Sequence, residues 1–402
     1  MTKGAPVVRP GSAMADDANE PMDQLTAHLD RGWDLVSRGD LAGAVVSAEK
    51  SLELNEESPE AHNLLGYILQ AQGRAEDALE HYKQALEIEE GYVDAMLNAA
   101  EVLLHPLHDY DAAINIVDDA LDWLEEDEID LIADALLIKV DVHLAREDRE
   151  AAKRVVALLP SGPFESPQLT LSVGRARFEV GDLEGAEPLI RRATEAEPPL
   201  ADAFYYLGLL LEAKGDRRGA LVGLLSARDL DLATPPPPWA LRHDEFERRV
   251  QAALNKLGPE LAPVVEGALI VVTDLPGAEV VAEGVDPRIA LMLDDVTQEP
   301  PKVGRVFVYQ RNVERFAGGL EGPQVVEKGE TFGGQARLLA AAAHEQREPE
   351  LVFQRLHLTA DRSLRNAPAL GGMPKASRRA QAREDLELAK GERQRPHRWR
   401  TV

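Results

Sequence analysis

The sequence predicts a mainly α-helical protein: a solenoid of stacked helix pairs, then a small α+β domain, then a disordered basic tail. Three observations support this fold class. Small residues recur every 34 residues in the first half of the chain, a period typical of helix-pair arrays. Four consecutive prolines at 235–238 end that pattern. Beyond them lie short apolar runs of the kind that form strands.

The 34-residue interval relates glycines and alanines along two stretches of the chain. The related positions are Gly32 and Gly66, Gly39 and Gly73, Ala44 and Ala78, Gly174 and Gly208, Gly181 and Gly215, and Ala186 and Ala220. Small side chains allow two helices to approach closely, and glycine in the turn adopts a backbone conformation that strains other residues. One helix pair cannot bury its own apolar face, so the units are expected to stack and share a core.

The clearest unit is HNLLGYILQAQGRAEDALEHYKQALEIEE, residues 62–90, and it resembles the tetratricopeptide repeat (TPR). The residues that carry the resemblance are Leu65, Gly66, Gly73, Ala78, Tyr82, Ala85 and Leu86. We therefore expect about six repeats over residues 25–233. The two weakest lie near 93–126, anchored by Ala113, and near 129–160, anchored by Ala152.

In the TPR family the first helices line the inner face of a curved array, so the resemblance implies a groove for a protein or peptide partner. The residues expected to face inward are Trp33, Asn63, Tyr67, Asn98, Glu101, Arg175, Tyr205 and Leu209. The alternative is that most of them are ordinary packing between helices. Family members that grip a carboxylate use Lys, Asn and Arg on this face. The matching positions here are mostly Leu29, Trp33 and Leu64, so a basic or apolar partner is expected.

Composition narrows the possible partners. The 402 residues include 71 acidic and 44 basic side chains, a net charge of −27. Nucleic acid is not expected, because phosphate binding needs clustered Lys and Arg, and basic partners are favoured. The absence of cysteine excludes disulfides and thiolate zinc sites. No membrane partner is expected, since no apolar run is long enough to span a bilayer. With no secretory signal recognised, the expected location is cytoplasmic and residues 1–24 are expected to be a disordered lead-in.

A separate domain is expected beyond a stiff proline linker at 234–239. Residues 243–258 form an amphipathic pattern with Phe246 and Val250 on one helical face. Residues 268–277 are predicted to form a buried strand that ends at Pro-Gly. Residues 304–317 begin as a second strand, with Val306 and Val308 on one side. These elements predict an α+β domain within 240–348.

Four patches of this segment resemble a bacterial family of small zincin-like metallopeptidases. They are Phe246–Leu257, the end of a strand at Asp274-Leu275-Pro276, the loop GVDPR at 284–288, and a strand VFVYQRNVER at 306–315. In that family the last strand leads into a helix with the motif H-E-x-x-H. Its two His bind Zn²⁺ and its Glu activates a bound water. None of the four patches is catalytic by itself.

The nearest match to the metal motif is His344-Glu345-Gln346-Arg347-Glu348, which reads H-E-x-x-E. His344 and Glu348 are the candidate zinc ligands and Glu345 the candidate catalytic base. Glycine-rich sequence before this motif lengthens the spacing to the strand, and Pro349 ends the helix at once. The favoured interpretation is therefore a TPR scaffold or adaptor, without a cofactor, that carries an inactive metallopeptidase-like domain.

Two alternatives remain open from the sequence. In one, the chain is a zinc-dependent metallopeptidase whose array recruits substrate. In the other, the second domain only caps the solenoid. Residues 318–402 carry 15 basic and 11 acidic side chains, a net charge of +4, and residues 349–402 are predicted to form the disordered basic tail. The abrupt change after Ala317 also permits the hypothesis of a shifted reading frame.

Overall fold

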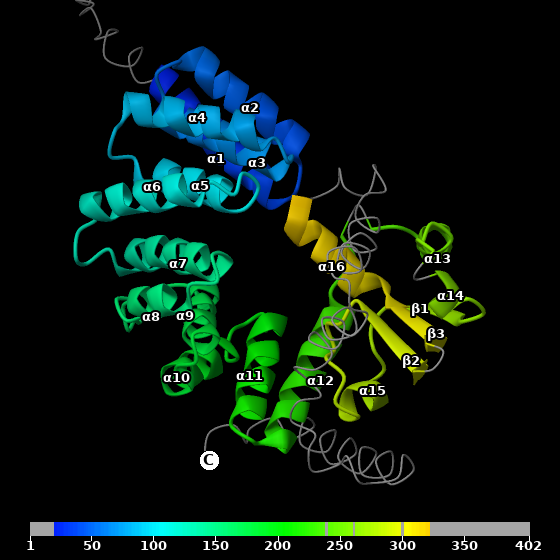
Figure 1. The fold of residues 1–402 in the computed structure, drawn as a ribbon. Helices are drawn as coiled ribbons and strands as arrows, with labels where there is room; N and C mark the ends of the chain where they lie inside the picture. Colours follow the sequence, from blue (N-terminus) through cyan, green and yellow to red (C-terminus); the bar gives the residue numbers. More distant parts are fainter. Residues whose placement is uncertain (1–19, 238–239, 260–261, 299–300, 322–402) are drawn as a thin grey trace, which may run out of the picture. The chain divides into compact units, whose positions relative to one another are not determined.

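The computed structural model describes residues 20–321, apart from 238–239, 260–261 and 299–300. The chain divides into two compact units, Met1–Arg146 and Glu147–Val402. The first contains α1 (Glu20–Ser37), α2 (Leu41–Leu54), α3 (Pro59–Ala71), α4 (Ala75–Ile88), α5 (Val93–Leu104), α6 (Tyr110–Trp123) and α7 (Ile129–Ala145) (Figure 1). Helices α1–α2, α3–α4 and α5–α6 form hairpins, and the first helices α1, α3, α5 and α7 contact one another in sequence.

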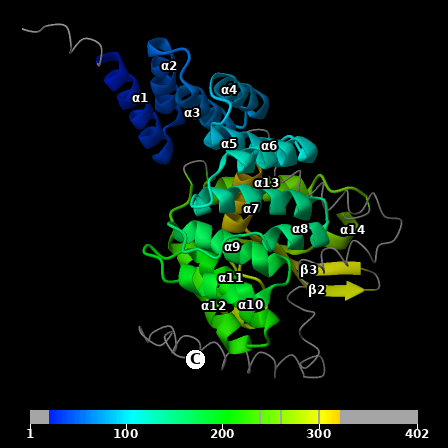
Figure 2. The ribbon, with the colours of Figure 1, turned by 90° about the vertical axis from the view of Figure 1, so that its left-hand side faces the viewer.

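The second unit begins with five helices and then changes to α+β structure (Figure 2). Its array helices are α8 (Arg149–Val156), α9 (Pro167–Glu179), α10 (Leu183–Ala193), α11 (Ala201–Ala213) and α12 (Arg217–Ala233). The later elements are α13 (His243–Leu254), α14 (Ala262–Val265), β1 (Leu269–Thr273), α15 (Ala278–Ala282), β2 (Leu291–Gln298), β3 (Pro301–Tyr309) and α16 (Gln310–Glu321). The predicted fold class, a mainly helical TPR-like solenoid followed by a small sheet, is confirmed.

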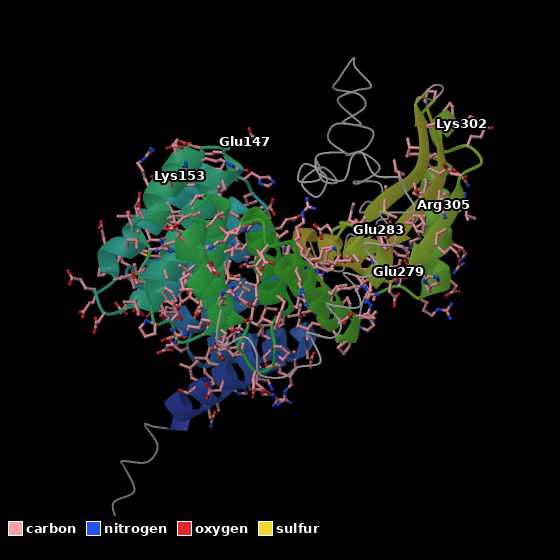
Figure 3. The ribbon with its side chains drawn as sticks, turned by 90° about the horizontal axis from the view of Figure 1, so that it is seen from below. Glu147, Lys153, Glu279, Glu283, Lys302 and Arg305 are labelled. Atoms are coloured by element: carbon pink, nitrogen blue, oxygen red, sulfur yellow. The ribbon has the colours of Figure 1, made fainter. Side chains whose placement is uncertain are left out.

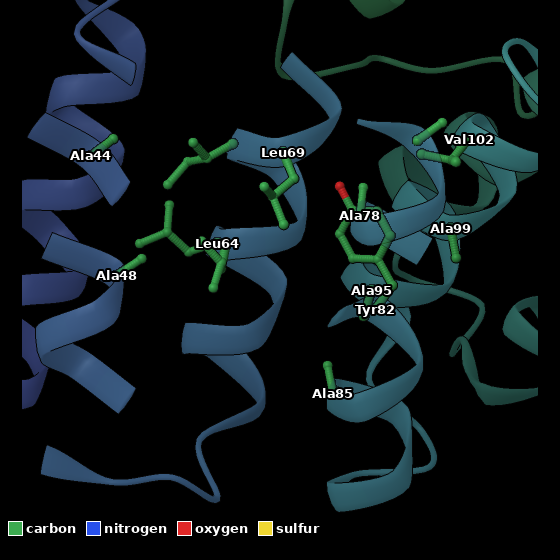
Figure 4. Packing of buried hydrophobic residues seen from close by; sticks show 13 residues of the cluster. Ala44, Ala48, Leu64, Leu69, Ala78, Tyr82, Ala85, Ala95, Ala99 and Val102 are labelled. Atoms are coloured by element: carbon green, nitrogen blue, oxygen red, sulfur yellow. The ribbon is translucent and has the colours of Figure 1, made fainter. Parts of the chain in front are cut away.

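Small residues bring the helices of a pair together, as the period predicts. Figure 4 shows Ala44 and Ala48 of α2 beside Leu64 of α3, and Tyr82 packed among the helices that follow. Tyr82 is fully buried and its hydroxyl donates to Gln70 Oε1 over 2.8 Å. A Cβ added to Gly66 would lie 2.6 Å from the Tyr82 ring. Glycine is therefore required here by the close approach of α3 and α4.

One residue with positive φ lies in each of the turns that follow α1, α3, α5, α7, α9 and α11. In four turns that residue is glycine, and in two it is His108 (φ 52°) or Glu147 (φ 59°). The four glycines are Gly39, Gly73, Gly181 and Gly215. The two exceptions fall in the two repeats whose sequence pattern is weakest. The positive φ is kept there without glycine, the residue that adopts it with least strain.

Aspartate usually follows the turn residue and caps the next helix. The carboxylate of Asp40, for example, accepts from the backbone N–H of Gly43 over 2.9 Å. The other capping aspartates are Asp109, Asp148, Asp182 and Asp216. Each cap satisfies a backbone donor that the first turn of the helix leaves unpaired, which explains why the second helices begin where they do.

The α+β part is built on a three-stranded sheet in the order β1-β3-β2. Strand β3 pairs parallel with β1 and antiparallel with β2. Phe246 and Val250 of α13 pack with Val306 and Val308 of β3, so the predicted helical face and strand face meet in one core. The side chains of Lys302 and Arg305 project from β3 in Figure 3, and Arg305 pairs with Asp294 of β2.

The predicted strand at 306–315 is wrong in its second half. Strand β3 ends at Tyr309, and residues 310–321 are helical. A helix places Gln310 one turn from Glu314, and the Gln310 side chain donates to Glu314 Oε1 over 2.8 Å. The alternation of apolar residues that is typical of a strand stops at Tyr309. The polar side chains after it, Arg311 and Asn312, project from helix α16 and donate to backbone carbonyls. Strand β2, which pairs with β3, is not among the elements expected from the sequence.

Candidate interaction face

The first helices of the first unit carry an exposed aromatic pair. Trp33 of α1 and Tyr67 of α3 have ring centroids 5.3 Å apart in an edge-to-face arrangement. Both remain 37–38% exposed, which is unusual for two large rings in mutual contact. The next position at the same interval of 34 residues is Glu101 of α5. We call these three residues the 33–67–101 row.

An amide pair joins the neighbouring positions of α3 and α5. Asn98 Nδ2 donates to Asn63 Oδ1 over 2.9 Å, and Asn63 Nδ2 donates to the Tyr92 hydroxyl over 3.4 Å. Asn63 is buried, whereas Asn98 is half-buried. The structure therefore brings these two predicted residues together, with Asn63 serving mainly to fix the helix pair and Asn98 closer to solvent.

Carboxylates gather where α5 faces α7. Glu101 lies near Asp130 and Asp134 of α7, and its carboxylate is 3.5 Å from the ring nitrogen of His105. Partial desolvation, with the charges of Asp130 and then Glu101, raises the pKa of Asp134 to about 6. The side chain of Asp134 still reaches solvent. An ionised carboxylate that is destabilised at an accessible position favours the approach of a cation.

Negative charge is concentrated in the first unit. Residues 20–146 carry 30 acidic and 7 basic side chains, a net charge of −23. Residues 147–321 carry 29 acidic and 20 basic side chains, a net charge of −9. Charge of this size attracts a basic partner over a distance set by ionic strength. The aromatic pair lies in the more acidic of the two units.

Models of the tetratricopeptide repeat match residues 29–93, 69–130 and 173–227. The chain carries tetratricopeptide repeats. Similar solved structures include PilF of Pseudomonas aeruginosa, 18% identical over 52% of this chain and 93% of that one, with a TM-score of 0.41. YrrB, a TPR protein with an unusual peptide-binding site, is 24% identical over 46% of this chain and 91% of that one, with a TM-score of 0.31.

A third similar structure is the APC/C hetero-tetramer Cut9–Hcn1. It is 13% identical over 54% of this chain and 42% of that one, with a TM-score of 0.44. No curated protein matches the sequence significantly. The repeat assignment thus comes from the family models, and it agrees with the helix pairs of the fold.

The three predicted inner-face residues of the later repeats have different surroundings. Arg175 and Leu209 are half-buried, and Arg175 lies 3.9 Å from Glu179. Tyr205 is engaged by the chain itself: its hydroxyl donates to Asp286 Oδ2 over 2.8 Å, and the guanidinium of Arg288 lies 4.4 Å from its ring centroid. This face of α11 is therefore covered at Tyr205 by the loop at 284–288.

Arg288 ties that loop to the last repeat. Its guanidinium lies 2.6 Å from Asp202 of α11 and 3.1 Å from Asp231 of α12. Asp231 is only 7% exposed, and it also pairs with Arg315 of α16 over 2.5 Å. Nearby, α15 packs on α12 through Val281. The α+β part is thus joined to the last repeat by ion pairs that meet at the buried Asp231 and by an apolar contact.

Helix α16 begins with side chains that bond loop carbonyls. Arg311 Nη1 donates to the carbonyls of Asp231, Leu232 and Thr234 at the end of α12, over 2.7–3.1 Å. Asn312 Nδ2 donates to the carbonyls of Pro287 and Ile289. A guanidinium at a helix C-terminus satisfies acceptors that the helix leaves unpaired. Arg311 and Asn312 of the 306–315 patch therefore join α16 to the end of α12 and to the 287–289 loop.

The predicted metal ligands His344 and Glu348 and the predicted base Glu345 lie outside the described residues. Within the part of the chain that the structure describes, no group of three or more His, Cys, Asp or Glu side chains is arranged to hold a metal ion. Over the same residues, no helix has the length and apolar character needed to cross a membrane.

Trp33, Tyr67 and Glu101 were expected on the inner face, whereas the carboxylates near Glu101 were not. Asp130 and Asp134 belong to the weak fourth repeat, and their proximity to Glu101 depends on how α7 packs against α5. The loop over Tyr205 was also missed, because Asp286 is 81 residues away in sequence. For the carboxylates, the available signal was the acidic composition of residues 125–134.

Proposed function

We propose that the chain is a protein-interaction module, a scaffold or adaptor, which binds a segment of a partner protein on the first helices of its early repeats. The observation that carries the proposal is the exposed Trp33–Tyr67 pair. Two rings in contact that still expose over a third of their surfaces suit an apolar side chain of a partner. The net charge of −23 on residues 20–146 favours a partner that is also basic.

We propose further that the α+β domain caps the array and carries out no catalysis. Two of the patches that resemble the metallopeptidases supply contacts to the last repeat, through Arg288 in the 284–288 loop and through Arg311 and Arg315. A terminal repeat needs such a cover for its apolar face. The competing proposal, a zinc peptidase acting through His344, Glu345 and Glu348, predicts stoichiometric zinc in the purified protein.

A peptide selection tests the interaction proposal. The full chain is presented with a displayed library of random twelve-residue peptides, and enriched peptides are titrated against the chain and its variants. We expect the double substitution Trp33→Ala with Tyr67→Ala to weaken binding at least about tenfold, the loss of a buried aromatic anchor being worth roughly 1.4 kcal/mol or more.

The matched control is Trp123→Ala on α6, a tryptophan that is 54% exposed on a second helix. This variant is expected to bind the enriched peptides like the unmodified chain. If the selection yields no binder, or if binders retain full affinity for the double variant, the proposed interaction face is wrong. Circular dichroism on each variant checks that the helices are intact.

A further inference from the structure

The 33–67–101 row places two aromatic rings and a carboxylate at one position of three consecutive repeats. The residues are 34 apart in sequence, and α1 contacts α3 while α3 contacts α5. The order of chemistry along the row is therefore indole, phenol, carboxylate. Trp33 and Tyr67 touch, and Glu101 lies at the acidic end with Asp130 and Asp134.

At two tyrosines, the same chain shows what group fits a phenol ring beside a carboxylate. In the last repeat, Arg288 lies over the Tyr205 ring at 4.4 Å and pairs with Asp202 and Asp231. The tyrosine hydroxyl is at the same time held by Asp286. This arrangement combines cation–π attraction with charge-assisted hydrogen bonds on one guanidinium.

A second example lies within the first unit. Arg146 lies over the Tyr110 ring at 5.6 Å, and its guanidinium is 2.6 Å from Asp111. Here the aromatic residue and the carboxylate come from α6 and the arginine follows α7. In both examples one guanidinium lies over a tyrosine ring and pairs with a carboxylate. A planar guanidinium suits this combination, and the ammonium group of lysine does not match it.

We propose that the 33–67–101 row recognises an arginine side chain in a basic segment of the partner protein, with the guanidinium over the Tyr67 ring and paired with Glu101. Trp33 then contacts an apolar side chain next to that arginine. The inference rests on the proposed function and adds the chemical class of its partner. It draws on charge complementarity with a unit of net charge −23 and on the two internal examples.

Three acetylated and amidated hexapeptides provide the probes: alternating Arg-Leu, alternating Lys-Leu, and alternating citrulline-Leu. Each is titrated into the full-length protein by calorimetry at low salt. We expect the arginine peptide to bind at least about fivefold more tightly than the lysine peptide, because only the guanidinium stacks and forms two parallel hydrogen bonds. Citrulline keeps the shape but not the charge, and we expect it to bind more weakly than either.

Substitutions in the 33–67–101 row test whether the preference for arginine arises there. Tyr67→Leu and Glu101→Gln are each expected to weaken arginine-peptide binding about fivefold or more and to remove the preference for arginine over lysine. Glu49→Gln on α2 has the same change of charge at an exposed second-helix position and is expected to leave the preference intact. Circular dichroism and thermal melting confirm that each variant is folded.

Three results would overturn the inference: equal affinity for the arginine and lysine peptides, no binding of the arginine peptide, or an arginine preference that survives both row variants. Each leaves the proposed function standing if displayed peptides still bind the Trp33–Tyr67 pair. If that selection also fails, the interaction face itself is wrong.

Discussion

The backbone angle φ is positive at one residue in each repeat turn, and the identity of that residue is expected to affect stability. Non-glycine residues pay for this conformation in strain, and His108 and Glu147 both adopt it. The Glu147 side chain is exposed, and Asp148 after it caps α8. A change at 147 therefore alters the turn with little effect on packing.

Glu147→Gly is expected to raise the free energy of unfolding by roughly 0.5–1 kcal/mol, because relief of strain exceeds the added entropy of the unfolded chain. Urea denaturation measures the difference. Gly215→Ala is the opposite control: a Cβ there meets nothing within 4 Å, so its expected loss comes from φ alone. An unchanged or lowered stability of Glu147→Gly would contradict the strain argument.

The raised pKa of Asp134 gives a pH dependence with a definite sign. The folded pKa is about 6 against an ordinary value of 3.8, so the folded protein holds the proton more tightly than the unfolded chain does. This carboxylate destabilises the fold above pH 6, and the penalty disappears as the pH falls toward 4. Asp134→Asn is therefore expected to be more stable than the unmodified chain at pH 7.5, with a difference that shrinks toward pH 4.

Denaturation midpoints at pH 4, 5, 6 and 7.5 test this, and subtraction of the two proteins removes the contribution of all other groups. A pH-independent difference, or a less stable variant at pH 7.5, would show that desolvation and the charges of Asp130 and Glu101 do not raise the pKa of Asp134.

At the scale of elements, one buried carboxylate of α12 is central to the contact with the α+β part. Asp231 accepts from Arg288 and Arg315, and removal of one partner from a buried ion pair typically costs about 3–5 kcal/mol. Arg288→Ala is expected to approach that range, since it uncovers Asp231 and also removes the contact with Tyr205. Arg242→Ala, an arginine whose side chain is 79% exposed, is the control and should change stability by less than about 0.5 kcal/mol.

A double-mutant cycle distinguishes the loss of the Asp231–Arg288 ion pair from unrelated losses of stability. Asp231→Leu combined with Arg288→Met replaces the ion pair by apolar groups of similar size, and part of the lost stability is expected to return. Additive losses in the double variant would mean that the two residues stabilise the fold independently, and the capping role would lose its main support.

Truncation tests the same junction more severely. Leu221, Val222 and Leu225 of α12 pack with Val281 of α15, so a chain ending at residue 240 exposes that apolar surface. We expect this shortened chain to self-associate in sedimentation experiments. A chain ending at residue 321 keeps the cover and should behave like the full chain. A monodisperse 1–240 fragment would refute the capping proposal.

At the scale of the whole molecule, the array was predictable because its signal is local and repeated. The 34-residue interval predicted the helix pairs, and Ala113 and Ala152, the anchors of the two weak repeats, are buried. Those repeats appeared weak because His108 and Glu147 replace the turn glycines. The α+β part was less predictable, since β2 contains Asp294 and Asp295, which interrupt its apolar pattern, and gains its stability by pairing with β3.

The candidate site was likewise only partly predictable from the sequence. The period aligned Trp33, Tyr67 and Glu101 on successive first helices, so the row could be read from sequence alone. Covering of Tyr205 by the 284–288 loop could not, because it depends on tertiary docking within the second unit. The predicted zinc ligands near residue 344 remain a prediction, and zinc analysis of the purified protein checks it: the scaffold proposal expects no stoichiometric metal and no change in melting temperature with a chelator.

Hydrogen exchange of the full chain, with and without a peptide enriched in the display selection, tests the interaction face most directly. Binding on the first helices predicts slower exchange in α1, α3 and α5, centred on the turns that contain Trp33, Tyr67 and Glu101, and no change in α2, α4 and α6. Protection confined to the second helices, or to the second unit, would contradict it.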